Sequence, residues 1–209
     1  MARPAKTRLS PEAIADAALA LIDSGHPFGL NAVARALGVK PPSLYNHVDG
    51  IGGIIELVRG RLAAQYLVDV DVADAAVAWD VVVEAMVRAE RRMYTEHPHV
   101  VPLIATSTVR DEGVIHAYDL KATELVRAGF PEPEVLVIVQ LLDAFALGSG
   151  LDYAAPDAVW EPSGPTVTLG RLLDAGPRGR ERNEQAFEIG LGMLLTGLRE
   201  RLAAHRAHA

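Results

Sequence analysis

Residues 30–48 read LNAVARALGVKPPSLYNHV, and this stretch decides the fold of the N-terminal part of the chain. Apolar residues recur at helical spacing on both sides of Gly38, namely Leu30, Val33, Ala34 and Leu37 before it and Leu44 and Val48 after it. A helix-turn-helix needs a small residue where its helices cross and a glycine where the backbone turns left-handed. Ala34 and Gly38 meet these needs, although helical hairpins that do not bind DNA share the spacing.

The helix after Gly38 carries side chains with polar ends, and it is too short to bury many apolar residues. In a helix-turn-helix the second helix enters the major groove, with its first residues nearest the base edges. We therefore predict that the side chains around this helix face DNA. They are Lys40, Pro41, Pro42, Ser43, Tyr45, Asn46 and His47.

The run AVARALGVKPPSLYNHV, residues 32–48, resembles the DNA-binding domain of the TetR family of bacterial transcriptional regulators. The resemblance rests on its leucine-glycine-valine, leucine-tyrosine and histidine-valine patterns. It implies that Tyr45 and His47 contact phosphates and that the other residues of the surface select the sequence. Asn46 is suited to reading adenine. The family also implies repression rather than activation.

Two departures from the family pattern predict weaker binding to the DNA phosphates. Gly29 stands where the family usually has a Thr or Ser that caps the helix and touches a phosphate. Asp49 and the glycines after it stand where a Lys is common. Because of these two departures, an alternative function remains open, namely that of a helical dimeric scaffold protein whose DNA binding is degenerate.

Charge is distributed unevenly along the 209 residues, whose net charge is −7. Residues 1–60 hold six Lys or Arg and five Asp or Glu, so the acidic excess lies beyond them. Because the DNA-binding head is nearly neutral, we expect the DNA affinity of one subunit to depend only weakly on salt concentration. Two heads are therefore needed for tight binding to DNA. Arg3, Lys6 and Arg8 form a basic arm that either follows a minor groove or frays.

The apolar spacing along the rest of the sequence predicts an all-α chain of about nine helices. We expect a helix-turn-helix domain at 1–52 and a ligand-binding and dimerisation domain at 53–209. Ser10 and Pro11 form a helix start, and Gly25 ends that helix. Further helices are predicted at about 53–67, 75–95, 100–107, 113–128, 134–153 and 182–205. A long loop rich in Pro and Gly is expected at 154–180.

Polar and polarisable groups among the apolar residues of the second domain predict an inducer site, as the resemblance also implies. Glu90 is notable because it interrupts an apolar stripe, and it either pairs with Arg91 or Arg127 or contacts the ligand. The candidate ligand-binding residues are Met86, Glu90, Met93, His99, Tyr118, Gln140 and Asp143.

Two helices, 134–153 and 182–205, combine apolar side chains with small residues, which favours close helix packing across a two-fold axis. FEIGLGMLLTGL, residues 187–198, also resembles the last helix of the tetracycline-repressor branch. The candidate homodimer contacts are Ala144, Gly148, Phe187, Gly190, Leu191 and Leu194. The expected mechanism is a homodimer on a pseudo-palindromic double-stranded operator, released by a small-molecule inducer.

Several classes of function are disfavoured by what the sequence lacks. The chain has no Cys and therefore no thiolate metal site, and His97, His99 and His116 lack the spacing of a helical zinc motif, so we expect neither metal nor cofactor. No G-x-S-x-G, P-loop or dinucleotide motif indicates an enzyme. We also expect no apolar run long enough to span a bilayer, no membrane partner and a cytoplasmic location.

Overall fold

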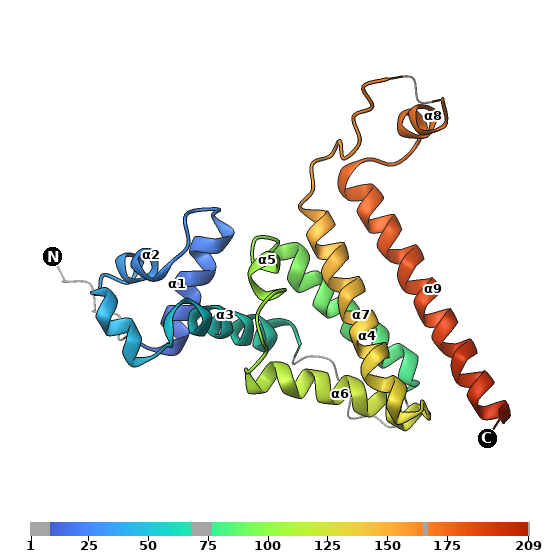
Figure 1. Ribbon diagram of the computed structural model, residues 1–209, viewed down its shortest axis with the longest axis horizontal. Coiled ribbons are helices and arrows are strands. Elements are labelled where there is room, and N and C mark those ends of the chain that lie inside the picture. The colour runs from blue at the N-terminus through green and yellow to red at the C-terminus, as the bar shows by residue number, and fades with distance from the viewer. Residues whose placement is uncertain (1–8, 68–76, 165–166, 209) are drawn as a thin grey trace. The chain divides into compact units, whose positions relative to one another are not determined.

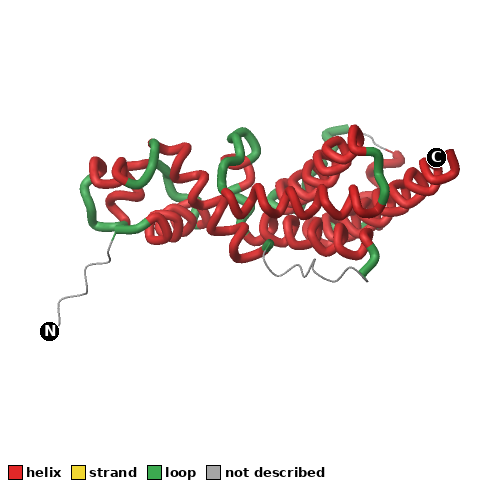
Figure 2. The backbone as a smooth tube through the Cα atoms, turned by 90° about the horizontal axis from the view of Figure 1, so that it is seen from below, coloured by secondary structure: helices red, strands yellow, loops and turns green. Residues whose placement is uncertain are grey.

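The computed structural model describes residues 9–67, 77–164 and 167–208, which form helices and no strand (Figures 1 and 2). Nine α-helices and one short 3-10 helix lie within these ranges, which confirms the all-α prediction. Two compact units divide the chain. The first comprises Met1–Val70 and His97–Leu120, and the second Asp71–Glu96 and Lys121–Ala209. The functional boundary at residue 52 stays a prediction.

The first unit begins with the predicted three-helix head, made of α1 (Pro11–Asp23), α2 (Leu30–Ala36) and the 3-10 helix η1 (Pro41–Asn46). Ser10 starts α1 as expected, because its hydroxyl accepts a hydrogen bond from the Ala13 amide at 3.2 Å. The apolar side chains that the sequence pattern placed inward form the core of this head. Ile14, Ala18, Val33, Ala34 and Leu44 are each at most 1 % exposed.

The turn between α2 and η1 is built on Gly38, whose φ of +66° lies in the left-handed region. The helix after the turn is a 3-10 helix rather than an α-helix. Pro41 and Pro42 occupy its start and carry no amide hydrogen, so they contribute no donor to the first turn. The Ser43 amide instead bonds the Lys40 carbonyl three residues back. The result is a short, tight helical turn with one buried side chain, Leu44.

Helix α3 (Gly50–Tyr66) packs on α1 and also contacts α5 (Val101–Ile104) within the same unit. Arg59 is buried on α3, and its Nη2 donates to the carbonyl oxygens of Ile104 and Ser107. Glu56, one turn earlier, accepts the amides of Arg110 and Asp111. These bonds hold residues 104–111 against α3.

The second unit is formed by α4 (Trp79–Glu96), the end of α6 (Glu112–Ala128), α7 (Glu132–Tyr153), α8 (Val167–Ala175) and α9 (Gly179–His208). In this unit α7 packs on both α4 and α9 (Figure 1). Gly150 lets α7 approach α4, because a Cβ there would overlap the Cβ of Tyr94. Phe145 and Phe187 stack between α7 and α9, with ring centroids 5.3 Å apart.

Helix α8 corrects the prediction of a continuous loop at 154–180. None of its residues is buried in the described protomer. Val167 is 88 % exposed and Leu172 is 52 % exposed. The surrounding Pro and Gly residues suggested a loop, but they flank this helix rather than interrupt it.

Helix α7 corrects the expectation that no segment is long and apolar enough to cross a membrane. In the described part of the chain this one helix meets that condition by length and composition, with a mean hydropathy of 1.7. One side of it forms the core of the second unit, where Leu142 and Ala146 are fully buried. The same composition therefore also fits a helix packed between protein surfaces.

Candidate functional site

The exposed side chains of residues 40–47 form a surface that we call the recognition surface. Tyr45 is 59 % exposed, and Lys40, Asn46 and His47 are also exposed. Leu44 and Val48 point inward and anchor the segment in the core of the head. Pro42 is exposed, while Pro41 and Ser43 are partly covered. The structure thus brings together the predicted residues of this surface. Arg3, Lys6 and Arg8 lie outside the described residues.

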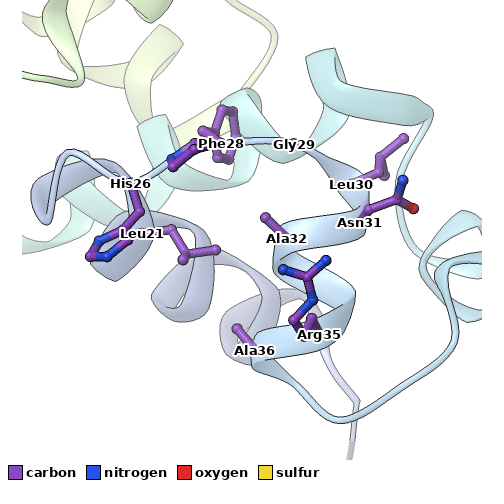
Figure 3. A pocket seen from close by; sticks show the side chains of 10 residues that line it. Leu21, His26, Phe28, Gly29, Leu30, Asn31, Ala32, Arg35 and Ala36 are labelled. Atoms are coloured by element: carbon purple, nitrogen blue, oxygen red, sulfur yellow. The ribbon is translucent and has the colours of Figure 1, made fainter.

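The start of α2 lies beside an open groove of about 560 Å³ between α1 and α2 (Figure 3). Leu21, Phe28 and Arg35 are among the residues that line it. Gly29 precedes α2 with an extended backbone and provides no side-chain hydrogen bond to it. The weaker phosphate contact expected from Gly29 stays a prediction. A Cβ at Gly29 would meet no other atom within 4 Å.

We expect Gly29→Ser to tighten binding to operator DNA by about threefold, because the open position accepts a side chain and a hydroxyl adds one cap and one phosphate contact. Fluorescence anisotropy with labelled operator measures this change. Gly29→Ala is the matched control, since it adds the Cβ without the hydroxyl. Equal affinities of the Ser and Ala variants would contradict the expected role of the hydroxyl.

Glu90 in the second unit is 6 % exposed and pairs with Lys121, which is fully buried. The Lys121 Nζ donates to the Glu90 Oε1 at 2.5 Å. This corrects the expected pairing with Arg91 or Arg127. Arg91 is the next residue on α4 and therefore points about 100° away around the helix, whereas Arg127 bonds Glu124 and the Val77 carbonyl.

The other oxygen of Glu90, Oε2, is buried and has no hydrogen-bond partner. Burial raises the pKa of the Glu90 carboxyl above its usual value, Lys121 opposes that rise, and Asp143 adds to it. Met86 and Met93, one turn before and after Glu90, are each 5 % exposed. The predicted ligand-binding residues Met86, Glu90, Met93 and Asp143 therefore all belong to the second unit.

The remaining predicted ligand-binding residues lie elsewhere. Gln140 is exposed on α7, so its side chain does not join the buried Glu90. His99 and Tyr118 belong to the first unit, where the His99 Nδ1 lies 3.3 Å from the Asp23 carbonyl oxygen. His97 lies two residues before His99, and its Nδ1 is 2.9 Å from the Asp23 Oδ2. Among the described residues no group of three or more His, Asp or Glu is placed to hold a metal ion.

The predicted dimer residues fall into two groups. Ala144 and Gly148 are exposed on α7, whereas Leu194 on α9 is partly covered. Phe187 and Leu191 are at most 2 % exposed and pack inside the protomer, so they have no surface left for a partner. Gly190 lies against the Phe145 ring, where a Cβ would come within 2.6 Å of a ring carbon. These three residues therefore form part of the α7–α9 packing within one chain.

Sequence reasoning missed the outward faces of α7 and α9. On α7, Val137 is 68 % and Leu141 is 46 % exposed, and on α9, Ile189 is 65 % and Met193 is 71 % exposed. On each helix these residues are four positions apart and therefore share a face. We call the outward residues Val137, Leu141, Ala144, Gly148, Ile189 and Met193 the apolar stripes. The sequence did carry a signal for the stripe on α7. Val137 and Leu141 precede Ala144 and Gly148 at intervals of three and four residues, which places all four on one side of the helix.

A polar network inside the second unit was also missed. The Arg91 Nε donates to the Ser149 Oγ at 3.0 Å, and its Nη2 donates to the Asn183 Oδ1 at 2.8 Å. Asn183 in turn donates to Asp152 and to the Ser149 carbonyl. The network joins α4, α7 and α9. Its residues come from three distant segments of the chain, so no local pattern points to it.

The described geometry is a helix-turn-helix with an exposed second helix, together with a helical unit that buries a charged pair and exposes apolar stripes. Residues 74–202 match the family described as tetracyclin repressor-like, C-terminal domain. The chain belongs to this TetR family. The match covers most of the chain, and it lies in the region where the sequence resemblance was least specific.

Known transcriptional repressors resemble the chain at low identity. The chain is 24 % identical to the HTH-type transcriptional repressor DrrR1 of Streptomyces coeruleorubidus over 70 % of its own length and 54 % of that protein, so it spans about half of this relative. It is 25 % identical to the tetracycline repressor protein class D of Escherichia coli, over 94 % of the chain and 92 % of that protein.

Solved structures support the same fold. Apo ActR from Streptomyces coelicolor superposes with a TM-score of 0.78 at 21 % identity, over 96 % of this chain and 98 % of ActR. The structure of ActR in complex with actinorhodin also matches, with a TM-score of 0.75 at 20 % identity, over 92 % of this chain and 96 % of ActR. At these identities the likeness establishes the fold.

Proposed function

We propose that this TetR-family chain is a ligand-responsive transcriptional repressor in the cytoplasm that binds a pseudo-palindromic operator as a homodimer and leaves it when a small-molecule inducer binds. The observation that carries the proposal is the recognition surface. Its polar side chains extend from a buried anchor at Leu44 and Val48 and have no role in the protomer core. The repressor name of DrrR1 supports repression as the direction of control.

Roles on the recognition surface follow from the chemistry of each side chain. Tyr45 and His47 bind phosphates, because both are exposed and both end in groups that donate hydrogen bonds. Asn46 reads adenine through its amide, which both donates and accepts. Lys40 and Ser43 are further candidates for base or phosphate contacts, whereas Pro41 and Pro42 make only apolar contacts. The arm with Arg3, Lys6 and Arg8 is proposed to lie along a minor groove.

The homodimer is proposed to form through the apolar stripes on α7 and α9. A folded monomer rarely exposes several large apolar side chains in adjacent rows, so such a surface indicates an interface. Two helices from each protomer would form a four-helix contact across a two-fold axis. This places the interface on Val137, Leu141, Ile189 and Met193, together with Ala144 and Gly148, rather than on Phe187 and Leu191.

The double substitution Val137→Glu and Met193→Glu is expected to yield a folded monomer that binds operator DNA at least about tenfold more weakly, because it buries four like charges in the dimer contact. Light scattering coupled to size-exclusion chromatography measures the mass. Val81→Glu is the matched control, since Val81 is 55 % exposed on α4 and outside the stripes. A double variant that remains dimeric would contradict this interface.

The inducer is proposed to bind in the second unit. ActR, which shares the fold, has been solved with the small molecule actinorhodin. In this chain the buried groups Glu90, Met86 and Met93 supply one polar anchor within an apolar surrounding, which is the composition of most small-molecule sites. A ligand that binds one conformation of this unit better than another shifts the population of the DNA-binding state.

DNA from the region upstream of the protein's own gene provides a direct test in solution. The purified protein is titrated into the labelled fragment at two salt concentrations, with a fragment of scrambled sequence as the control. We expect saturable binding to the genomic fragment, with two protomers bound per site. Equal affinity for both fragments at both salt concentrations would favour the scaffold alternative.

A further inference from the structure

Glu90 is an unusual residue to find in the core of the second unit. Its carboxylate is fully enclosed, Lys121 occupies one oxygen, and the other oxygen has no partner. Buried polar atoms in folded proteins almost always have hydrogen-bond partners, so an exception calls for a physical explanation. A bound molecule is one source of the missing partner.

The pair is not explained by stability alone. A buried ion pair loses hydration on both groups, and replacing such a pair by apolar side chains of similar size often leaves a protein equally stable or more stable. Leaving Oε2 unpaired adds to that cost. If positions 90 and 121 served only to hold α4 and α6 together, apolar residues at both positions would stabilise the core as well or better.

The charges around Glu90 indicate what kind of partner fits. Asp143 on α7 is close enough to raise the pKa of Glu90, so a second carboxylate lies near the pair that Glu90 forms with Lys121. An added anion would be repelled by this arrangement, whereas an added cation would balance it. A ligand ammonium can donate a charge-assisted hydrogen bond to Glu90 Oε2.

The side chains next to Glu90 can make room for such a ligand. Met86 and Met93 flank it along α4 and are both buried. Methionine is unbranched and polarisable, so it adapts its conformation to the shape of a bound molecule more readily than a branched side chain does. An apolar ligand body can therefore lie against these two residues while its amine bonds Glu90.

We infer that the inducer of this protein is an apolar molecule that carries an amine, and that the amine binds the free carboxylate oxygen of Glu90 beside Lys121 and Asp143. This inference rests on the proposed function, since it names the ligand class of the regulatory site. The orphan oxygen, the charge balance and the flanking methionines support it independently of any relative.

Three probes that share one carbon skeleton test the inference on the full-length protein, namely phenylbutylamine, phenylbutanol and phenylbutyrate. Thermal unfolding and titration calorimetry measure their binding. We expect the amine to raise the unfolding midpoint of the wild type the most and phenylbutyrate to have no effect. Glu90→Gln should weaken amine binding by about tenfold or more, because a neutral amide replaces the carboxylate.

Two further variants separate binding from folding. The double variant Glu90→Met with Lys121→Met removes both charges and should fold without any preference for the amine. Glu84→Gln is the control on the same helix, because Glu84 pairs with Arg88 at the surface, and it should keep the wild-type preference. Absence of an amine preference in the wild type, or an equal preference in the double variant, would overturn the inference.

Operator binding is measured on the same preparations without probe. If the wild type binds operator DNA but shows no amine preference, the inferred ligand class fails and the proposed repressor function stands. If the wild type prefers the amine but binds no operator, the ligand site stands and the proposed function fails.

Discussion

The double substitution Tyr45→Ala and His47→Ala is expected to weaken operator binding by about a hundredfold or more without unfolding the protein. Each side chain contributes a phosphate contact of about 1 kcal/mol, and a dimer loses both contacts in each of its two heads. Both residues are exposed, so their removal leaves the core around Leu44 intact. Anisotropy titration with labelled operator measures the affinity.

The control for this experiment is an equally mild double substitution outside the head. Glu181 and Gln185 are exposed on α9 and bond each other at 3.2 Å, so replacing both by alanine should leave operator affinity unchanged. Circular dichroism establishes that each variant keeps its helices. Unchanged affinity in the Tyr45 and His47 variant would show that DNA is bound by another surface.

Gly150→Ala is expected to destabilise the protein by about 3 kcal/mol or more, measured as the free energy of unfolding in urea. The added Cβ would overlap the Cβ of Tyr94, which lies next to the backbone of α4 and cannot turn away. The two helices must therefore separate. Since α7 also packs on α9, the loss extends through the second unit.

Gly192→Ala is the matched control for Gly150→Ala. Gly192 also lies inside a helix, but a Cβ there would meet no atom within 4 Å. Alanine is favoured over glycine in a helix interior by about 1 kcal/mol, so this variant should be as stable as the wild type or more stable. A Gly150→Ala variant as stable as the Gly192→Ala variant would mean that the α4–α7 contact is not closely packed.

The head was predictable from sequence because its signals are local. Gly38 marks the left-handed turn, Ser10 and Pro11 mark the start of α1, and Leu44 and Val48 mark the buried side of the second helix. The 3-10 form of that helix was not predicted. The prediction of exposed polar groups did not depend on the helix type.

The second unit was less predictable because its decisive contacts join distant segments. Glu90 and Lys121 are 31 residues apart, and no periodicity distinguishes Lys121 from Arg91 or Arg127 as the partner. Helix α7 is apolar on nearly every side, so its sequence does not reveal which side faces the core. The same difficulty applies to α9, where Leu191 and Ile189 looked equivalent in the sequence, although Leu191 is buried and Ile189 is 65 % exposed.

The most direct test of the central claim is to recover fragmented genomic DNA on the purified protein at two salt concentrations and to sequence the bound fragments. The account predicts enrichment of a pseudo-palindrome whose half-sites lie about one helical turn apart or a multiple of it. The Tyr45→Ala and His47→Ala variant should lose this enrichment. Recovery of no specific sequence even at low salt would contradict the claim that this chain is a dimeric DNA-binding regulator.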